Sequence, residues 1–70
     1  MLERQMEVSE TARRIQCALG NHGEMSTHEL EMTVDTSPQL LRFALGWLAS
    51  EDKVEIVSVN ADTKVRLKFN

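Results

Sequence analysis

The residues of this 70-residue chain that could hold a metal ion or catalyse a reaction are few. Cys17, His22 and His28 are the candidate metal ligands, but their spacing does not match a usual zinc pattern. Glu24 or Glu29 would have to supply a fourth ligand. The sequence also contains no glycine-rich phosphate loop, nucleophile motif or HExxH pair. We therefore expect no metal, cofactor, small-molecule substrate or enzymatic activity, and the role of Cys17 stays open.

Three polar residues stand where a base-reading helix would present its first turns. Ser37, Gln39 and Arg42 lie at the start of a predicted helix. Arginine can bind guanine and glutamine can bind adenine through two hydrogen bonds, which discriminates between bases by about 1–3 kcal/mol. If this helix is the second of a helix-turn-helix pair, its N-terminal residues touch base edges. These three residues are therefore candidate DNA contacts.

A basic strand near the C-terminus is the second candidate for DNA contact. Lys64, Arg66 and Lys68 alternate with apolar residues and share a predicted face with Val57 and Val59. That face could be simply solvated, could contact phosphates or could contact a protein. The two valines favour a protein, because valine offers a phosphate nothing. Three cations would give only weak DNA binding, with a log–log salt slope of about −3.

The charge around the candidate reading helix opposes DNA binding. Residues 26–52 hold five carboxylates and one cation, which is a net charge of −4, and the whole chain carries −3. DNA affinity rests largely on phosphates neutralised by lysine and arginine, so this surface would repel them. The members of this charged set are Glu29, Glu31, Asp35, Glu51, Asp52 and Arg42.

A candidate protein interface lies on the same helix. Gly46, Ala49 and Ser50 are small and fall on its exposed arc, where they would let another helix approach closely. Val57 and Val59 complete the candidate interface. Two alternatives stay open: Gly46 could serve internal packing instead, and Trp47, which we expect in the core, could be an exposed hot spot.

Three helices must position these residues. The first runs roughly from Val8 to Asn21, with an apolar stripe at helical spacing. The second begins at Ser26, which forms a capping box with Glu29, and the third begins at Ser37, with Pro38 in its first turn. The stripes expected to face the core are Val8, Ala12, Ile15 and Leu19; Leu30 and Val34; and Leu40, Leu41, Ala44, Leu45, Trp47 and Leu48.

The C-terminal segment predicts a β-hairpin, because apolar and charged residues alternate from Lys64 to Phe69. A turn at Ala61-Asp62, or a looser four-residue turn in the same register, puts Val54, Ile56 and Ser58 opposite Phe69, Leu67 and Val65 on the inner face. The outer face then pairs Glu55, Val57 and Val59 with Lys68, Arg66 and Lys64. A short strand near Met25 is expected beside the hairpin.

Length and composition indicate one small domain. We expect residues 1–7 to form a mobile N-terminal arm and residues 8–70 to form the domain. The lone cysteine indicates a reducing compartment, and the N-terminal residues lack the apolar run of a signal peptide. No apolar stretch approaches the length of a membrane span. We therefore expect a cytoplasmic location.

The chain resembles a family of small bacterial winged helix-turn-helix domains of unassigned function. The resemblance rests on Ala44–Ala49 (ALGWLA) followed by Glu51-Asp52-Lys53, and it covers roughly residues 8–67. It implies an α+β winged helix fold and a regulatory or DNA-binding role. With the charges, we expect a binding module that contacts a protein partner or forms a homodimer, with DNA binding as the alternative. One departure is Asp35, where such turns usually prefer glycine; aspartate tolerates the left-handed conformation.

Overall fold

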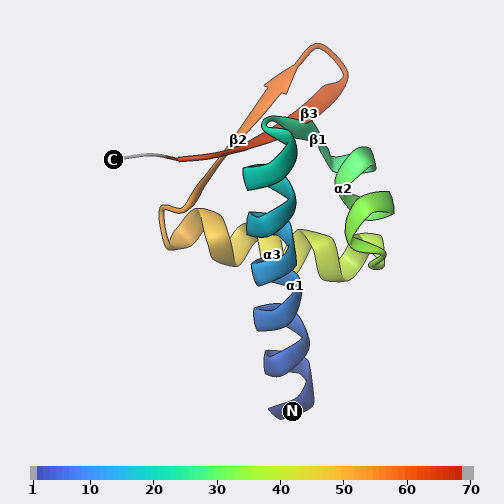
Figure 1. The fold of residues 1–70 in the computed structure, drawn as a ribbon, viewed down its shortest axis with the longest axis vertical. Coiled ribbons are helices and arrows are strands. Elements are labelled where there is room, and N and C mark those ends of the chain that lie inside the picture. Colours follow the sequence, from blue (N-terminus) through green and yellow to red (C-terminus); the bar gives the residue numbers. More distant parts are fainter. Residues whose placement is uncertain (1, 69–70) are drawn as a thin grey trace.

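The computed structural model describes residues 2–68, and the side chains of residues 7–58 and 60–68. Its elements are α1 (Leu2–His22), β1 (Met25–Ser26), α2 (Thr27–Val34), α3 (Pro38–Ser50), β2 (Val54–Val59) and β3 (Asp62–Leu67). The three strands form an antiparallel sheet in the order β1-β3-β2, and α1 crosses α3 (Figure 1). The predicted α+β architecture is confirmed, including the short strand at Met25.

The helix starts follow their capping residues. The Ser26 hydroxyl accepts the Glu29 backbone N–H at 3.1 Å, and the Glu29 carboxylate accepts the Ser26 N–H at 3.0 Å. The latter bond above all, with the Ser26 side chain second, lowers the pKa of the Glu29 carboxyl below its usual value of 4.5. The Ser37 hydroxyl accepts the Leu40 N–H at 3.2 Å. Both predicted N-caps are thus confirmed.

The first helix is longer than predicted. Its backbone is helical from Leu2, whereas the apolar stripe predicted a start near Val8. Among the described side chains, Val8 is the first that packs against the core, and the apolar stripe begins there. Helical backbone therefore covers most of the segment predicted as an arm, while the side chains of residues 1–6 lie outside the described part.

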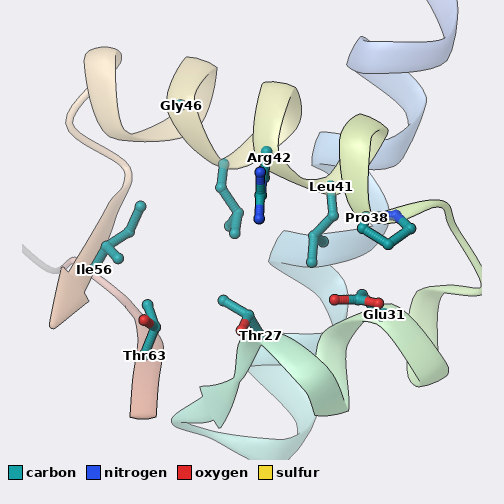
Figure 2. Close-up of a pocket in the computed structure, with 9 residues that line it drawn as sticks. Thr27, Glu31, Pro38, Leu41, Arg42, Gly46, Ile56 and Thr63 are labelled. Atoms are coloured by element: carbon teal, nitrogen blue, oxygen red, sulfur yellow. The ribbon is translucent and has the colours of Figure 1, made fainter. Parts of the chain in front are cut away.

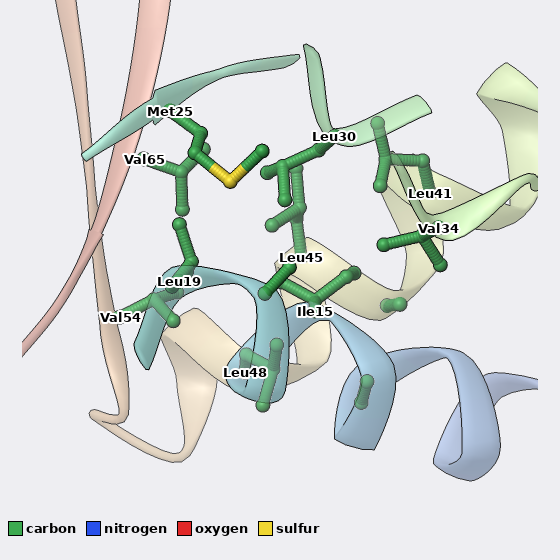
Figure 3. Close-up of a cluster of buried hydrophobic side chains, with 13 residues drawn as sticks. Ile15, Leu19, Met25, Leu30, Val34, Leu41, Leu45, Leu48, Val54 and Val65 are labelled. Carbon is green, nitrogen blue, oxygen red and sulfur yellow. The ribbon is translucent and has the colours of Figure 1, made fainter. Parts of the chain in front are cut away.

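The core lies between α1, α3 and the inner face of the sheet (Figure 3). Ile15 of α1, Leu30 of α2 and Val65 of β3 are completely buried, so these three elements each contribute an anchor to the core. Met25, just before the α2 cap, lies beside Leu30 in this cluster, as a hydrophobic staple requires. The cluster consists of Ala12, Ile15, Ala18, Leu19, Met25, Leu30, Val34, Leu41, Ala44, Leu45, Leu48, Val54 and Val65.

The predicted hairpin turn lies one residue too far along the chain, so the predicted register is wrong. The turn lies at Asn60-Ala61, so Ile56 pairs with Val65 and Glu55 with Arg66. Asn60 adopts a left-handed conformation with φ 58°, which asparagine tolerates better than alanine, so the turn settles there. The shift moves each pairing by two residues and keeps every residue on its predicted face. The predicted partner of Val54, Phe69, lies outside the described residues, and Val54 pairs with Leu67 instead.

Replacing Ser26 with alanine should lower the free energy of unfolding by about 1 kcal/mol, because the Glu29 N–H loses its acceptor. Urea unfolding followed by circular dichroism measures the change. The matched control is Ser9→Ala on the exposed side of α1, where alanine only improves helix propensity. Equal losses in the two variants would contradict the capping role of Ser26.

Candidate functional site

One narrow stripe of α3 is buried, Leu40 beside it is half-buried, and the other residues of the helix are exposed. Leu41, Ala44, Leu45 and Leu48 recur at helical spacing and are all buried. The other side of the helix holds the candidate residues Gln39, Arg42, Gly46, Ala49 and Ser50, all of them exposed. Ser37, the N-cap, is also exposed. The candidate DNA contacts of α3 and the candidate protein contacts of α3 therefore share one helix surface.

Two aromatic residues belong to that surface as well. Phe43 is 70% exposed and Trp47 is 43% exposed. The expectation that Trp47 lies in the core is wrong, because the buried stripe is narrower than predicted and Trp47 lies about 100° around the helix from its centre. Phe43 and Trp47 are four residues apart and are therefore neighbours on the helix surface. The tight spacing of the four stripe residues is the sequence signal that could have placed both aromatics outside.

Gly46 packs against none of the described residues closely enough to require a glycine. A Cβ atom built on it would meet nothing within 4 Å. The alternative that Gly46 permits close internal packing is therefore unsupported by the geometry. A glycine inside a helix costs about 1 kcal/mol relative to alanine, and here no contact within the described residues offsets that cost.

A groove of about 370 Å³ runs beside this surface, between α3, α2 and the hairpin (Figure 2). Arg42 points from α3 into it, and Ile56 bounds it on the hairpin side. Glu31 of α2 also lines the groove and adds a carboxylate to it. A second hollow of about 300 Å³ lies on the other side of α3, where Glu7 lines it together with Phe43. The exposed ridge of α3 thus stands between two hollows, each with a carboxylate in its lining.

The cations of the hairpin are largely neutralised by carboxylates of this chain. Arg66 forms an ion pair with Glu55 at 3.3 Å, and Lys68 pairs with Asp52. The hydrogen bond and charge of Asp52 raise the pKa of the Lys68 ammonium. Among the described side chains, Lys64 has no carboxylate within ion-pair distance. The predicted pairing of Glu55 with Lys68 is wrong, because the register places Arg66 opposite Glu55.

The hairpin cations and Arg42 belong to different faces. Ile56 and Thr63 line the groove beside α3, so the inner face of the hairpin looks toward that helix. Lys64 and Arg66 alternate with these residues along the strands and lie on the outer face. Arg42 and the hairpin cations therefore do not share one continuous surface. Val57 is half-buried on the outer face, and the Val59 side chain lies outside the described part.

Within the described ranges, no three His, Cys, Asp or Glu side chains cluster closely enough to hold a metal ion. Cys17 is exposed on α1, where its sulfur lies 3.9 Å from the Asn21 amide nitrogen. None of the helices, over the residues described, is both long and apolar enough to cross a bilayer.

Gly46→Ala should raise the free energy of unfolding by about 0.5–1 kcal/mol, because the new methyl group enters open space and the helix gains propensity. Thermal or urea unfolding measures the difference. The matched control is Gly23→Ala, which should destabilise the domain by about 1 kcal/mol because Gly23 holds a φ of 78°. A destabilised Gly46→Ala variant would show that the helix needs this glycine internally.

Comparison with known proteins yields a single kind of match. A family model described as a winged helix-turn-helix domain (DUF2582) matches residues 1–67. Neither the curated proteins nor the solved structures contain a match to this chain.

Proposed function

Because the chain belongs to the winged helix-turn-helix domain family DUF2582, we propose that it is a non-enzymatic binding module whose α3 surface contacts another protein. The observation that carries this proposal is the exposure of Phe43 and Trp47 beside Gly46 on α3. A winged helix by itself does not fix a function, so the argument rests on this surface.

The composition of the α3 surface suits a protein partner. Aromatic residues are enriched in the buried centres of protein interfaces, while charged residues are depleted there. Arg42 is the one charged residue of α3, and arginine is also enriched in hot spots. Next to the aromatic pair, the short side chains of Gly46, Ala49 and Ser50 leave space above the helix backbone. A partner helix can therefore seat its side chains between Phe43 and the flanking groove.

Electrostatics points in the same direction. The acids Glu7 and Glu31 flank α3 on its two sides. Arg66 and Lys68, which a phosphate backbone would need, are already paired with carboxylates of this chain. A duplex would have to break these pairs or tolerate the nearby carboxylates. The surface is therefore better suited to a protein partner with apolar and basic side chains than to a polyanion such as DNA. Since such a module acts through the partner that it holds, we assign it a regulatory role.

DNA binding through α3 is the second candidate function. It is favoured by one observation: Gln39 and Arg42 are both exposed in the first turns of α3, where a recognition helix contacts bases. A dimer that brought together two hairpins would also bring together two copies of Lys64. Among the residues described as lining the groove with Arg42, none is a second cation, so a phosphate backbone would find little positive charge there.

A photo-reactive phenylalanine analogue at position 43 should crosslink to protein in cells that make this chain. The adduct should resist nuclease. It should disappear in Gly46→Arg, because the arginine side chain occupies the space beside position 43 that the partner would fill. The same analogue at Arg13, on the exposed side of α1, is the control and should give no such adduct.

With the captured partner purified, Phe43→Asp should raise the Kd of the complex by about thirtyfold or more. Its effect on stability should stay within about 0.5 kcal/mol. A nuclease-sensitive adduct, or full binding by Gly46→Arg, would contradict the proposal.

A duplex titration separates the two functions directly. If α3 contacts protein, adding mixed-sequence duplex at low salt should leave the amide NMR signals of Arg42, Lys64 and Arg66 unmoved. DNA binding instead predicts saturable shifts at these residues that added salt removes, because phosphate contacts release counterions. Such shifts would make DNA binding the better assignment.

A further inference from the structure

Among the described residues, strand β2 has a hydrogen-bonded neighbour on one side only. The sheet order β1-β3-β2 places it at the edge, and β3 occupies its other side. The strand spans six residues, Val54–Val59, which is a full-length strand rather than a short protected one. Its outer edge is therefore available to another strand.

The backbone groups that point to the free edge can be identified. The Lys68 N–H donates to the Lys53 carbonyl at 3.0 Å, which fixes the phase of the ladder between β2 and β3. Because backbone groups alternate in direction along a strand, Glu55 and Val57 also point toward β3. Val54, Ile56 and Ser58 then direct their N–H and C=O groups outward. Within the described chain, no backbone hydrogen bond outside the ladder engages these three residues.

Within the described chain, this edge carries few of the devices that prevent strand addition. Proteins usually protect an edge with proline, lysine, a bulge or a covering loop. Val54–Val59 contains no proline or lysine, and its register with β3 runs without a bulge from one end to the other. Ile56, in the middle of the edge, keeps 44% of its surface exposed although it lies on the inner face. The centre of the edge is thus both unpaired and apolar.

We propose that β2 pairs antiparallel with β2 of a second copy of this chain, centred on Ile56, to form one continuous six-stranded sheet. This inference concerns the free edge of β2 and does not depend on the proposed function, although Ile56 also bounds the groove beside α3.

The strand is complementary to itself in this register. Ile56 lies opposite Ile56 of the second copy, and Val54 lies opposite Ser58. Glu55 lies opposite Val57, so no like charges face each other, and Arg66 already neutralises each Glu55. A shift by one pair in one direction would place Glu55 opposite its own copy, and a shift in the other direction would leave Val54 unpaired. The pairing centred on Ile56 uses every outward backbone group of Val54, Ile56 and Ser58.

Amide hydrogen exchange tests this pairing at residue level. Raising the protein concentration from about 10 μM to about 1 mM should slow exchange at Val54, Ile56 and Ser58 at least about tenfold, since their N–H groups gain acceptors. Exchange at Glu55 and Val57 should stay the same, because β3 already binds those N–H groups. A dimer formed through α3 would leave all five rates unchanged with concentration.

The register is tested by NMR on a mixture of isotope-labelled and unlabelled chains. Residues opposite each other outside the hydrogen-bonded pairs bring their Hα atoms together. An intermolecular NOE is therefore expected between Hα of Glu55 and Hα of Val57. An NOE between the two Glu55 residues, or strand contacts to a different element, would overturn the proposed register.

Two substitutions test whether the edge itself causes association. Ser58→Pro removes an N–H that the monomer does not use, and Ile56→Lys places a charge in the middle of the edge. Both should give a monomer by sedimentation velocity at concentrations where the unchanged chain associates. Ile56→Lys replaces a half-exposed side chain, so its monomer should fold even if proline disturbs the strand. The control Lys64→Ala, on the strand inside the sheet, should associate like the unchanged chain. Persistence of the dimer in Ile56→Lys, or a chain that remains monomeric at about 1 mM, would overturn the inference.

Discussion

The packing of the α3 stripe against α1 and the sheet holds this domain together. Leu41, Ala44, Leu45 and Leu48 are buried there, and Ile15 of α1 is completely enclosed with them. A 70-residue chain can bury only about 60% of the surface that its unfolded form exposes. The core accepts one stripe of each helix, so Phe43 and Trp47 remain outside. The exposed aromatics of α3 are thus a consequence of a small core.

Ion pairs within the chain reduce the positive charge that the hairpin surface presents. The hairpin carries the densest group of cations in the sequence, yet Glu55 and Asp52 lie close enough to bind two of them. These exposed pairs contribute little to stability. Their effect is on recognition, because they reduce the positive field that a polyanion would meet. Over the described side chains, the hairpin therefore presents a weaker positive field than its cations alone would give.

Three non-glycine residues in the left-handed conformation set the geometry between elements. Asp35 ends α2, Asp52 turns the chain from α3 into β2, and Asn60 forms the hairpin turn. Asp52 also holds Lys68 just beyond β3, so this turn is tied to the open end of the hairpin, opposite the Asn60-Ala61 turn. The position of Asn60 decides the register, and the register in turn pairs Ile56 with Val65 and Glu55 with Arg66.

Much of this structure follows from residue types and spacing alone. Ser26 and Ser37 begin their helices because each hydroxyl satisfies a backbone N–H in the first turn, and the alternation in β3 separates Lys64 and Arg66 from Val65. These are local effects, so the sequence determined them. The exposure of Trp47 depends on which arc of α3 is covered by α1, and the pairing of Arg66 depends on which residue the turn brings opposite it. Both result from contacts between distant segments, and only the tertiary structure decided them.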